Sequence, residues 1–126
     1  MVLQFAAVGI GAALGAWTRW CLSLWLNPKL PSFPLGTLAS NLVGGYLVGF
    51  AVAFFAARAD VPVEWRLFVI TGLLGGLTTF STYSAEVVDL LMRGAYGNAT
   101  TLALTHVAAS IVLTIAGFAT FQLLTR

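Results

Sequence analysis

The chain has 126 residues, of which 60% are hydrophobic and only 8% are charged, and its formal net charge is +2. An ordinary soluble domain has about 25% charged residues, and a mean hydropathy of +0.96 leaves too little polar surface to face water. A soluble enzyme, a nucleic-acid-binding protein and a secreted disulfide-rich scaffold are therefore excluded, and the length allows one domain, residues 1–126. This composition predicts an all-α integral membrane protein.

Four long apolar stretches predict four transmembrane helices. A helix needs about 20 predominantly apolar residues to cross a bilayer, and turns containing proline or glycine separate stretches of that length. The expected helices cover residues 2–26, 33–57, 66–92 and 98–124. The first stretch lacks the charged start of a signal peptide and three more follow it, so we interpret it as a membrane span.

The positive charges do not favour one orientation, although Lys and Arg normally accumulate on the cytoplasmic side. Three lie on each side of the expected bundle: Arg58, Arg66 and Arg126 with the N-terminus, and Arg19, Lys29 and Arg93 opposite. Such a tie permits a dual topology in which oppositely inserted copies pair as an antiparallel homodimer. A weakly biased protein that inserts one way is the alternative. The pairs Gly11–Gly15 and Gly45–Gly49 indicate close helix packing.

Polar residues recur every four positions on two expected helices and so share a face on each. The two stripes are Thr37, Asn41, Gly45 and Gly49, and His106, Ser110 and Thr114. Asn41 either joins helices by hydrogen bonds or serves a functional site, and His106 is either a satisfied hydrogen-bonding group or a proton carrier. Near the span ends, either Arg19 reaches the membrane surface and Glu86 caps or pairs, or both line a vestibule.

The third expected helix contains an adjacent glycine pair, Gly75 and Gly76, followed by a run of hydroxyl side chains. The run comprises Thr78, Thr79, Ser81, Thr82 and Ser84. Both residue types weaken a continuous helix, so we predict that helix three is broken near mid-membrane, where free backbone groups must be buried in protein or line a cavity. Free carbonyls would suit a cation and free N–H groups an anion. A straight helix with a tight glycine contact is the alternative.

Two aromatic rings follow the expected break. Phe80 and Tyr83 are three residues apart and share a face, and Ser81 and Thr82 add hydroxyl donors beside them. An aromatic ring has a positive edge and a negative face. Rings presented edge-on would therefore suit a small anion, whereas ring faces would suit a cation.

The run from Gly75 to Glu86, GGLTTFSTYSAE, closely resembles the signature of the CrcB/Fluc fluoride channel family. The spacings of Gly11, Gly15 and Arg19, and of Gly36, Thr37, Asn41 and Gly44, are similar to the same family. This resemblance extends over essentially the whole chain. The family usually has a second phenylalanine where this chain has Tyr83, and the added hydroxyl changes the size and hydrogen bonding of that ring.

The resemblance implies an antiparallel homodimer with two fluoride pores. It implies that backbone carbonyls of Gly75 and Thr78 from both subunits hold a structural Na⁺, the only cofactor expected. Fluoride would contact the ring edges of Phe80 and Tyr83 and the amide of Asn41. The other implied positions are Ser110 and Thr114 along the pore and Arg19 near its mouth.

The function expected from these features is passive flow of fluoride across the bacterial inner membrane, which lowers cytoplasmic fluoride without covalent chemistry or an enzyme activity. The partners would be fluoride, a second copy of the chain and the bilayer. A small dual-topology, proton-coupled multidrug exporter is the alternative. That class needs an acid within its first helix, where this chain has Gln4 and Arg19. A non-conducting assembly subunit would leave the hydroxyl run unexplained.

Overall fold

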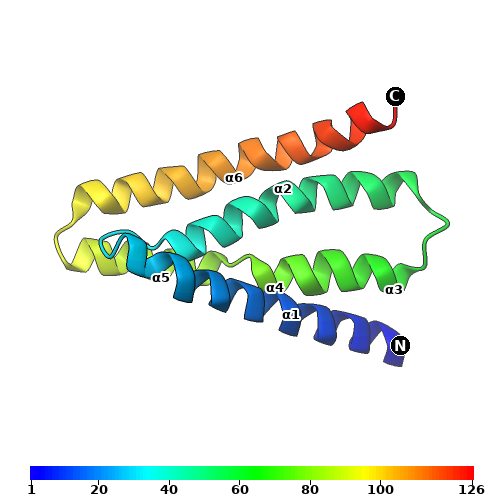
Figure 1. Ribbon diagram of the computed structural model, residues 1–126, viewed down its shortest axis with the longest axis horizontal. Helices are drawn as coiled ribbons and strands as arrows, with labels where there is room; N and C mark the ends of the chain where they lie inside the picture. The colour runs from blue at the N-terminus through cyan, green and yellow to red at the C-terminus, as the bar shows by residue number, and fades with distance from the viewer.

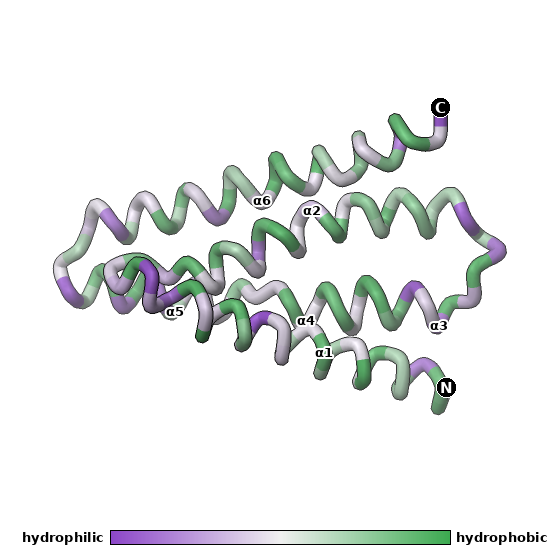
Figure 2. The backbone as a smooth tube through the Cα atoms, viewed as in Figure 1, coloured by the Kyte–Doolittle hydropathy of each residue, from purple (hydrophilic) through white to green (hydrophobic).

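The computed structural model covers residues 1–126 and consists of helices and their connections. Four helical spans are long and apolar enough to cross a membrane: Val2–Lys29, Leu35–Ala57, Val63–Met92 and Tyr96–Leu124. They lie side by side, with both termini and the α2–α3 connection at one end and the other two connections at the opposite end (Figure 1). Hydrophobic residues dominate along all four, and hydrophilic residues occur in the connections and at scattered positions along the helices (Figure 2). The prediction of an all-helical protein with four membrane-length helices is confirmed.

The first half of the chain forms three helical segments: α1 (Val2–Leu26), the 3₁₀ turn η1 (Asn27–Lys29) and α2 (Leu35–Ala57). Helix α2 begins two residues later than expected because Pro34, at ψ 84°, is not helical and restricts the residue before it. The side chain of Asn27 compensates for the lack of a capping side chain at Pro34. Its Oδ1 accepts a hydrogen bond from the backbone N–H of Gly36 at 2.8 Å.

The third span is assembled from four segments rather than one regular helix. In chain order these are α3 (Val63–Arg66), the π-helix η2 (Leu67–Leu74), α4 (Gly75–Leu77) and α5 (Phe80–Met92). It starts at Val63, three residues before the expected position, because Pro62 is extended and leads directly into the first turn. Thr78 and Thr79 are extended, with ψ of 154° and 125°, and separate α4 from α5. A π-helix of this length is rare, and nothing in the sequence predicts it.

The last helix, α6 (Tyr96–Leu124), begins two residues earlier than expected. Gly94 has a φ of +75°, a left-handed conformation that costs glycine little. The Gly94 N–H bonds to the carbonyl of Leu91, and the Ala95 N–H bonds to that of Leu90. The connection from α5 is therefore a tight turn, and α6 starts immediately after it.

Two glycine-mediated contacts within the chain fix the helix arrangement. Helix α1 packs backbone to backbone on η2 and α4: a Cβ atom on Gly15 would collide with the carbonyl oxygen of Leu73, and one on Gly76 with that of Ala12. Helix α2 packs on α6 in the same way, and a Cβ atom on Gly49 would collide with the carbonyl oxygen of Thr114. The close packing expected from the glycine pairs is thus made between helices of one protomer.

Candidate functional site

The interruption of the third span, formed by the extended residues Thr78 and Thr79 between α4 and α5, has its own hydrogen-bonding pattern. The N–H and the hydroxyl of Thr78 both donate to the carbonyl of Leu74, at 3.0 and 2.8 Å. The hydroxyl oxygen of Thr79 accepts from the backbone N–H of Thr82 at 3.2 Å and so caps the start of α5. The carbonyl of Thr78 receives no hydrogen bond from within the chain. The interruption therefore has a capped helix start and a free carbonyl.

The side chain of Asn41, on α2, replaces helical hydrogen bonds that the interruption lacks. Its Oδ1 accepts from the Thr79 N–H at 2.7 Å, and its Nδ2 donates to the Thr79 carbonyl at 2.9 Å. The same Nδ2 lies 3.1 Å from Nδ1 of His106 on α6. Asn41 thus joins helices, one of the two roles considered for it. That the Asn41 amide donates a hydrogen bond to fluoride stays a prediction. It requires Nδ2 to give up one of these two hydrogen bonds and to donate to the ion instead.

The two aromatic rings of α5 lie in different surroundings. Phe80 is 75% exposed in the single chain, whereas Tyr83 is 9% exposed. Their ring centroids are 5.4 Å apart with an interplanar angle of 65°, an edge-to-face arrangement. The Tyr83 ring stacks on His106 at 4.4 Å and 30°, and its hydroxyl donates to the Ala103 carbonyl at 3.1 Å. That hydroxyl therefore joins α5 to α6.

A groove of about 390 Å³ lies between α2, the interruption, α5 and α6. Its lining residues are Asn41, Gly45, Thr78, Thr79, Phe80, Tyr83, His106, Val107, Ser110 and Ile111. Several predicted site residues are thus brought to one place. Ser81, Thr82 and Thr114 do not line it, and the Thr114 hydroxyl donates to the carbonyls of Gly45 and Ser110 at 3.0 and 2.8 Å. The functional roles of all these residues remain predictions.

The predicted cation ligands are backbone carbonyls beside the interruption. The amides of Thr78 and Thr79, the usual helical partners of the Gly75 carbonyl, donate to Leu74 and Asn41 instead. No group of three or more His, Cys, Asp or Glu side chains converges anywhere in the chain. Free carbonyl oxygens at Gly75 and Thr78 fit a hard cation such as Na⁺.

Arg19 lies against the bundle rather than in a connection. Its Nε donates to the carbonyl of Gly76 at 3.2 Å, which satisfies a carbonyl near the C-terminal end of α4. A cation here also stabilises the negative end of the helix dipole. The structure therefore shows an anchoring contact for Arg19, and its place at a pore mouth remains a prediction.

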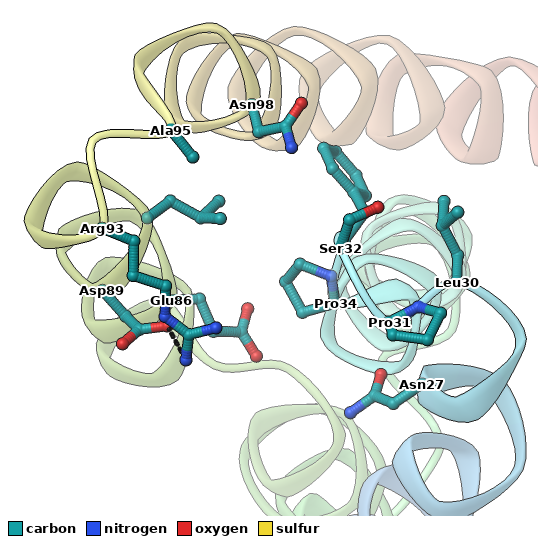
Figure 3. Close-up of a pocket in the computed structure, with 12 residues that line it drawn as sticks. Asn27, Leu30, Pro31, Ser32, Pro34, Glu86, Asp89, Arg93, Ala95 and Asn98 are labelled. Carbon is teal, nitrogen blue, oxygen red and sulfur yellow. Dashed lines mark ion pairs between the residues drawn. The ribbon is translucent and has the colours of Figure 1, made fainter.

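A second hollow of about 310 Å³ lies at the end of the bundle where α1 joins α2 and α5 joins α6 (Figure 3). Glu86 lines it, and its Oε1 accepts a hydrogen bond of 2.5 Å from the hydroxyl of Thr37. The other carboxylate oxygen, Oε2, is buried without a partner. Asp89 and Arg93 form a 2.7 Å ion pair at the rim. Glu86 is therefore hydrogen-bonded to α2 through Thr37 and forms no ion pair within the chain.

The sequence drew attention to two further residues, Thr79 and His106, but did not assign them to the site. Thr79 caps α5 and is held by Asn41, and a threonine directly before Phe80 was a usable signal because threonine is a favoured N-cap residue. His106 is stacked on Tyr83 and bonded to Asn41, and only its i+4 spacing to Ser110 indicated that it faces the interior. Their shared partner, Asn41, was identified from sequence, but its contacts were not.

Four apolar spans with a polar groove between them define a small multi-pass membrane protein that carries a polar site among its helices. Residues 6–118 match the family described as CrcB-like protein, Camphor Resistance (CrcB). The chain belongs to this family, which confirms the resemblance found in the sequence.

Similar proteins cover nearly the full chain. The fluoride-specific ion channel FluC of Thiobacillus denitrificans is 58% identical over 95% of this chain and 97% of its own. That of Cupriavidus taiwanensis is 55% identical over 97% of each chain. The FluC protein of Paraburkholderia phymatum is 52% identical over 100% of both chains.

Proposed function

We propose that this protein is a fluoride-selective ion channel of the bacterial inner membrane that passes F⁻ down its electrochemical gradient and lowers cytoplasmic fluoride. Relatives that share 52–58% of their residues with it over nearly the whole chain are named fluoride-specific ion channels. The structural observation that carries the proposal is the groove at the interruption between α4 and α5, which several polar side chains line. It gathers donors and aromatic rings in an otherwise apolar chain.

The groove supplies groups that replace the water around a small anion. Fluoride is strongly hydrated, so a conducting pathway must exchange that hydration for protein donors. The Ser110 hydroxyl lines the groove and makes no hydrogen bond within the chain, and the exposed Phe80 ring can turn its positive edge to an ion. The Asn41 amide would join only by exchanging an existing bond. We infer that the ion passes along this groove.

We further propose that a second copy of the chain, inserted in the opposite orientation, covers the groove. In the single chain Phe80 and Gly75 are exposed and the Thr78 carbonyl has no partner. Lipid cannot hydrogen-bond a free carbonyl, so exposed irregular backbone at membrane depth needs protein around it. A self-complementary face on an antiparallel partner would provide that cover.

The charge distribution supports the antiparallel orientation. Because Arg19 is anchored to α4, it contributes little to the charge near the connections. The remaining positive charges divide three to two: Arg58, Arg66 and Arg126 against Lys29 and Arg93. A difference of one charge gives a weak orientation signal.

The proposed dimer brings the free carbonyls of Gly75 and Thr78 from two chains to one interface. We propose that they hold a structural Na⁺, which would neutralise four carbonyl oxygens that face one another. Purification with Na⁺ replaced by N-methyl-D-glucamine should lower the thermal midpoint of the dimer, and added NaCl should restore it. An unchanged midpoint at every Na⁺ concentration would remove Na⁺ from the proposal.

The function is tested by ion efflux from liposomes that contain the purified protein. Vesicles loaded with KF or KCl and treated with valinomycin report anion efflux with an ion-selective electrode. We expect rapid fluoride efflux and chloride efflux no faster than from protein-free vesicles. Equal rates for the two anions, or no protein-dependent efflux, would overturn the proposed function.

The orientation is tested by labelling a single cysteine near the C-terminus. Thr125→Cys in a Cys21→Ser background leaves every charged residue in place. With an impermeant maleimide, about half of this cysteine should be labelled from each face of the membrane if insertion is unbiased. Asn98→Cys, at the opposite end of α6, provides the matched control. Labelling of each cysteine from one face only would exclude a dual topology.

A further inference from the structure

Lys29 is a positive charge without an acidic partner at one end of the bundle. No acid lies within ion-pair distance of it, because the two ion pairs of the chain are formed by other residues. Its side chain is exposed, and its Nζ lies 4.1 Å from the centroid of the Trp25 ring. A cation above a ring is attracted by the negative face of the aromatic system. The ammonium group is therefore held in place and still free to bind an anion.

The length of the first span places this charge at the level of the lipid headgroups. The span Val2–Lys29 has 28 residues and ends at Lys29 itself. At 1.5 Å per residue its length is about 42 Å, which matches the roughly 40–45 Å of a bilayer with its headgroup regions. Lipid phosphates lie in those regions. An anionic headgroup is thus the anion that Lys29 meets.

Helix α1 presents aromatic rings to the lipid on the membrane side of Lys29. The side of the helix that carries Gly15 and Ser23 packs on the third span and on α2. On the opposite side, Trp17, Trp20 and Leu24 are 62%, 63% and 60% exposed, and their spacing puts them on one face of the helix. Three of the four tryptophans of the chain lie between positions 17 and 25. An apolar, aromatic surface therefore extends inward from the charge.

These rings extend deeper than an ordinary belt of interfacial aromatic residues. Trp and Tyr are enriched at the headgroup level, and Trp25, four residues before Lys29, fits that position. Trp17 lies twelve residues before Lys29, about 18 Å along the helix axis, where the bilayer consists of hydrocarbon. The charge and the rings are therefore complementary to the two parts of one lipid, its headgroup and its acyl chain.

We propose that Lys29, Trp25 and the exposed face of α1 form a binding site for an anionic phospholipid. The ammonium group binds the phosphate as a compact point charge, and an acyl chain lies along Trp20 and Trp17. A basic side chain near the membrane surface strengthens binding of an anionic lipid by about fivefold. The site is separate from the groove, so it does not depend on the proposed function. An antiparallel dimer would carry one such lipid in each leaflet.

The test is quenching of tryptophan fluorescence by brominated lipids. A Trp65→Phe background leaves the three tryptophans of α1 as the only ones in the chain. Brominated acyl chains quench the rings that they touch, so quenching by brominated phosphatidylglycerol and by brominated phosphatidylcholine, at equal mole fraction, gives the relative affinity of the two lipids. We expect phosphatidylglycerol to bind about fivefold more tightly in this background and equally tightly once Lys29→Gln is added.

Arg58→Gln is the matched control, because it removes the same charge from another cation that lies near an aromatic ring. Arg58 is 5.9 Å from the ring centroid of Phe54, but it is paired with Asp60 at 3.4 Å. This variant should keep the preference for phosphatidylglycerol. Equal affinity for the two lipids before Lys29 is changed, or the same preference with and without Lys29→Gln, would overturn the proposal.

Inorganic phosphate distinguishes a lipid site from a site for any anion. Added in excess at constant ionic strength, it should leave the quenching by brominated phosphatidylglycerol unchanged, because the acyl chain contributes to binding of the lipid. Recovery of fluorescence on addition of phosphate would show that the headgroup alone is bound, and it would overturn the assignment of the α1 face to a lipid.

Discussion

The contact of α1 with η2 and α4 and the contact of α2 with α5 and α6 use different means to hold helices together. In the first, backbones touch: Gly15 and Gly76 leave no room for a Cβ atom against the neighbouring main chain. The side chain of Arg19 adds a hydrogen bond to this contact, from its Nε to the carbonyl of Gly76. In the second, polar side chains such as Asn41 and Thr37 bond across to the interruption and to Glu86. The third span takes part in both, with its first half in one contact and its second half in the other.

This difference indicates that the two contacts have different roles: one supports the fold and the other forms the polar site. In hydrocarbon, close van der Waals packing can hold helices without any polar group, and the α1 contact provides such a rigid support. Polar groups in the same environment need partners, and the α2 contact satisfies most of its own while leaving a few donors free. Substitutions in the first region should therefore affect assembly, and substitutions in the second should affect conduction.

The largest effect is expected from Gly15→Leu, in the α1 contact. A Cβ atom there would collide with the Leu73 carbonyl oxygen and lie 2.7 Å from the Leu77 nitrogen, and the backbone cannot move aside. We expect no monodisperse protein in size-exclusion chromatography. Gly9→Leu is the matched control, because a Cβ atom at Gly9 meets nothing within 4 Å and should leave assembly unchanged. Normal assembly of Gly15→Leu would contradict the backbone contact.

Asn41→Asp should abolish fluoride efflux and also weaken the fold. Aspartate can still accept from the Thr79 N–H, but it presents an oxygen to the Thr79 carbonyl and to Nδ1 of His106, where Asn41 donates. The unpaired charge should lower the free energy of unfolding by about 3 kcal/mol or more. The measurement is the thermal midpoint, which should fall. The negative charge would also repel an anion in the groove. Wild-type efflux from a correctly assembled variant would show that fluoride conduction needs neither the hydrogen bonds donated by Asn41 nor an uncharged side chain at this position.

Phe80→Ile should reduce fluoride efflux by up to about tenfold, because it removes an aromatic edge but keeps an apolar side chain. The side chain is 75% exposed in the single chain, so folding of the protomer should not change. The measurement is liposome efflux together with the elution volume of the dimer. Unchanged efflux would exclude the ring edge as a fluoride ligand.

The smallest effect is expected from Tyr83→Phe, which retains the ring and its stacking on His106. Only the hydroxyl bond to the Ala103 carbonyl is lost, at a cost of about 1 kcal/mol. The thermal midpoint should fall by a few degrees, whereas fluoride selectivity should persist and conduction should be at least as fast. If Tyr83→Phe is inactive while Phe80→Ile conducts normally, the hydroxyl is the ligand and the account of the ring edge is wrong.

The four spans could be predicted because length and hydropathy are local properties of the sequence. The Gly75–Gly76 pair and the hydroxyl run also directed attention to residues 75–84, where the extended Thr78 and Thr79 lie. Helix ends were predicted to within three residues, and the shifts arise at Pro34, Pro62 and Gly94, whose effects depend on the local backbone angles.

The partners of the polar residues could not be predicted in the same way. A four-residue spacing shows which residues share a face, but it does not show what that face meets on another helix. Asn41 and Thr79 are 38 positions apart, and Asn41 and His106 are 65 apart. The π-helix η2 also lies against α1, and its sequence carries no signal that predicts it.

The pairing of α2 with α6 also affects how the protein is made. Helix α2 has its most extensive contact with the last helix of the chain, and α1 packs mainly on the third span rather than on α2. At about 5–20 residues per second, roughly 3–13 s pass between synthesis of the end of α2 and of the end of α6. During that interval the polar face of α2 has no α6 to pack on, so the insertion machinery must shelter it. A nascent chain arrested after Met92 should therefore remain crosslinked to the insertase, whereas the full-length chain should be released.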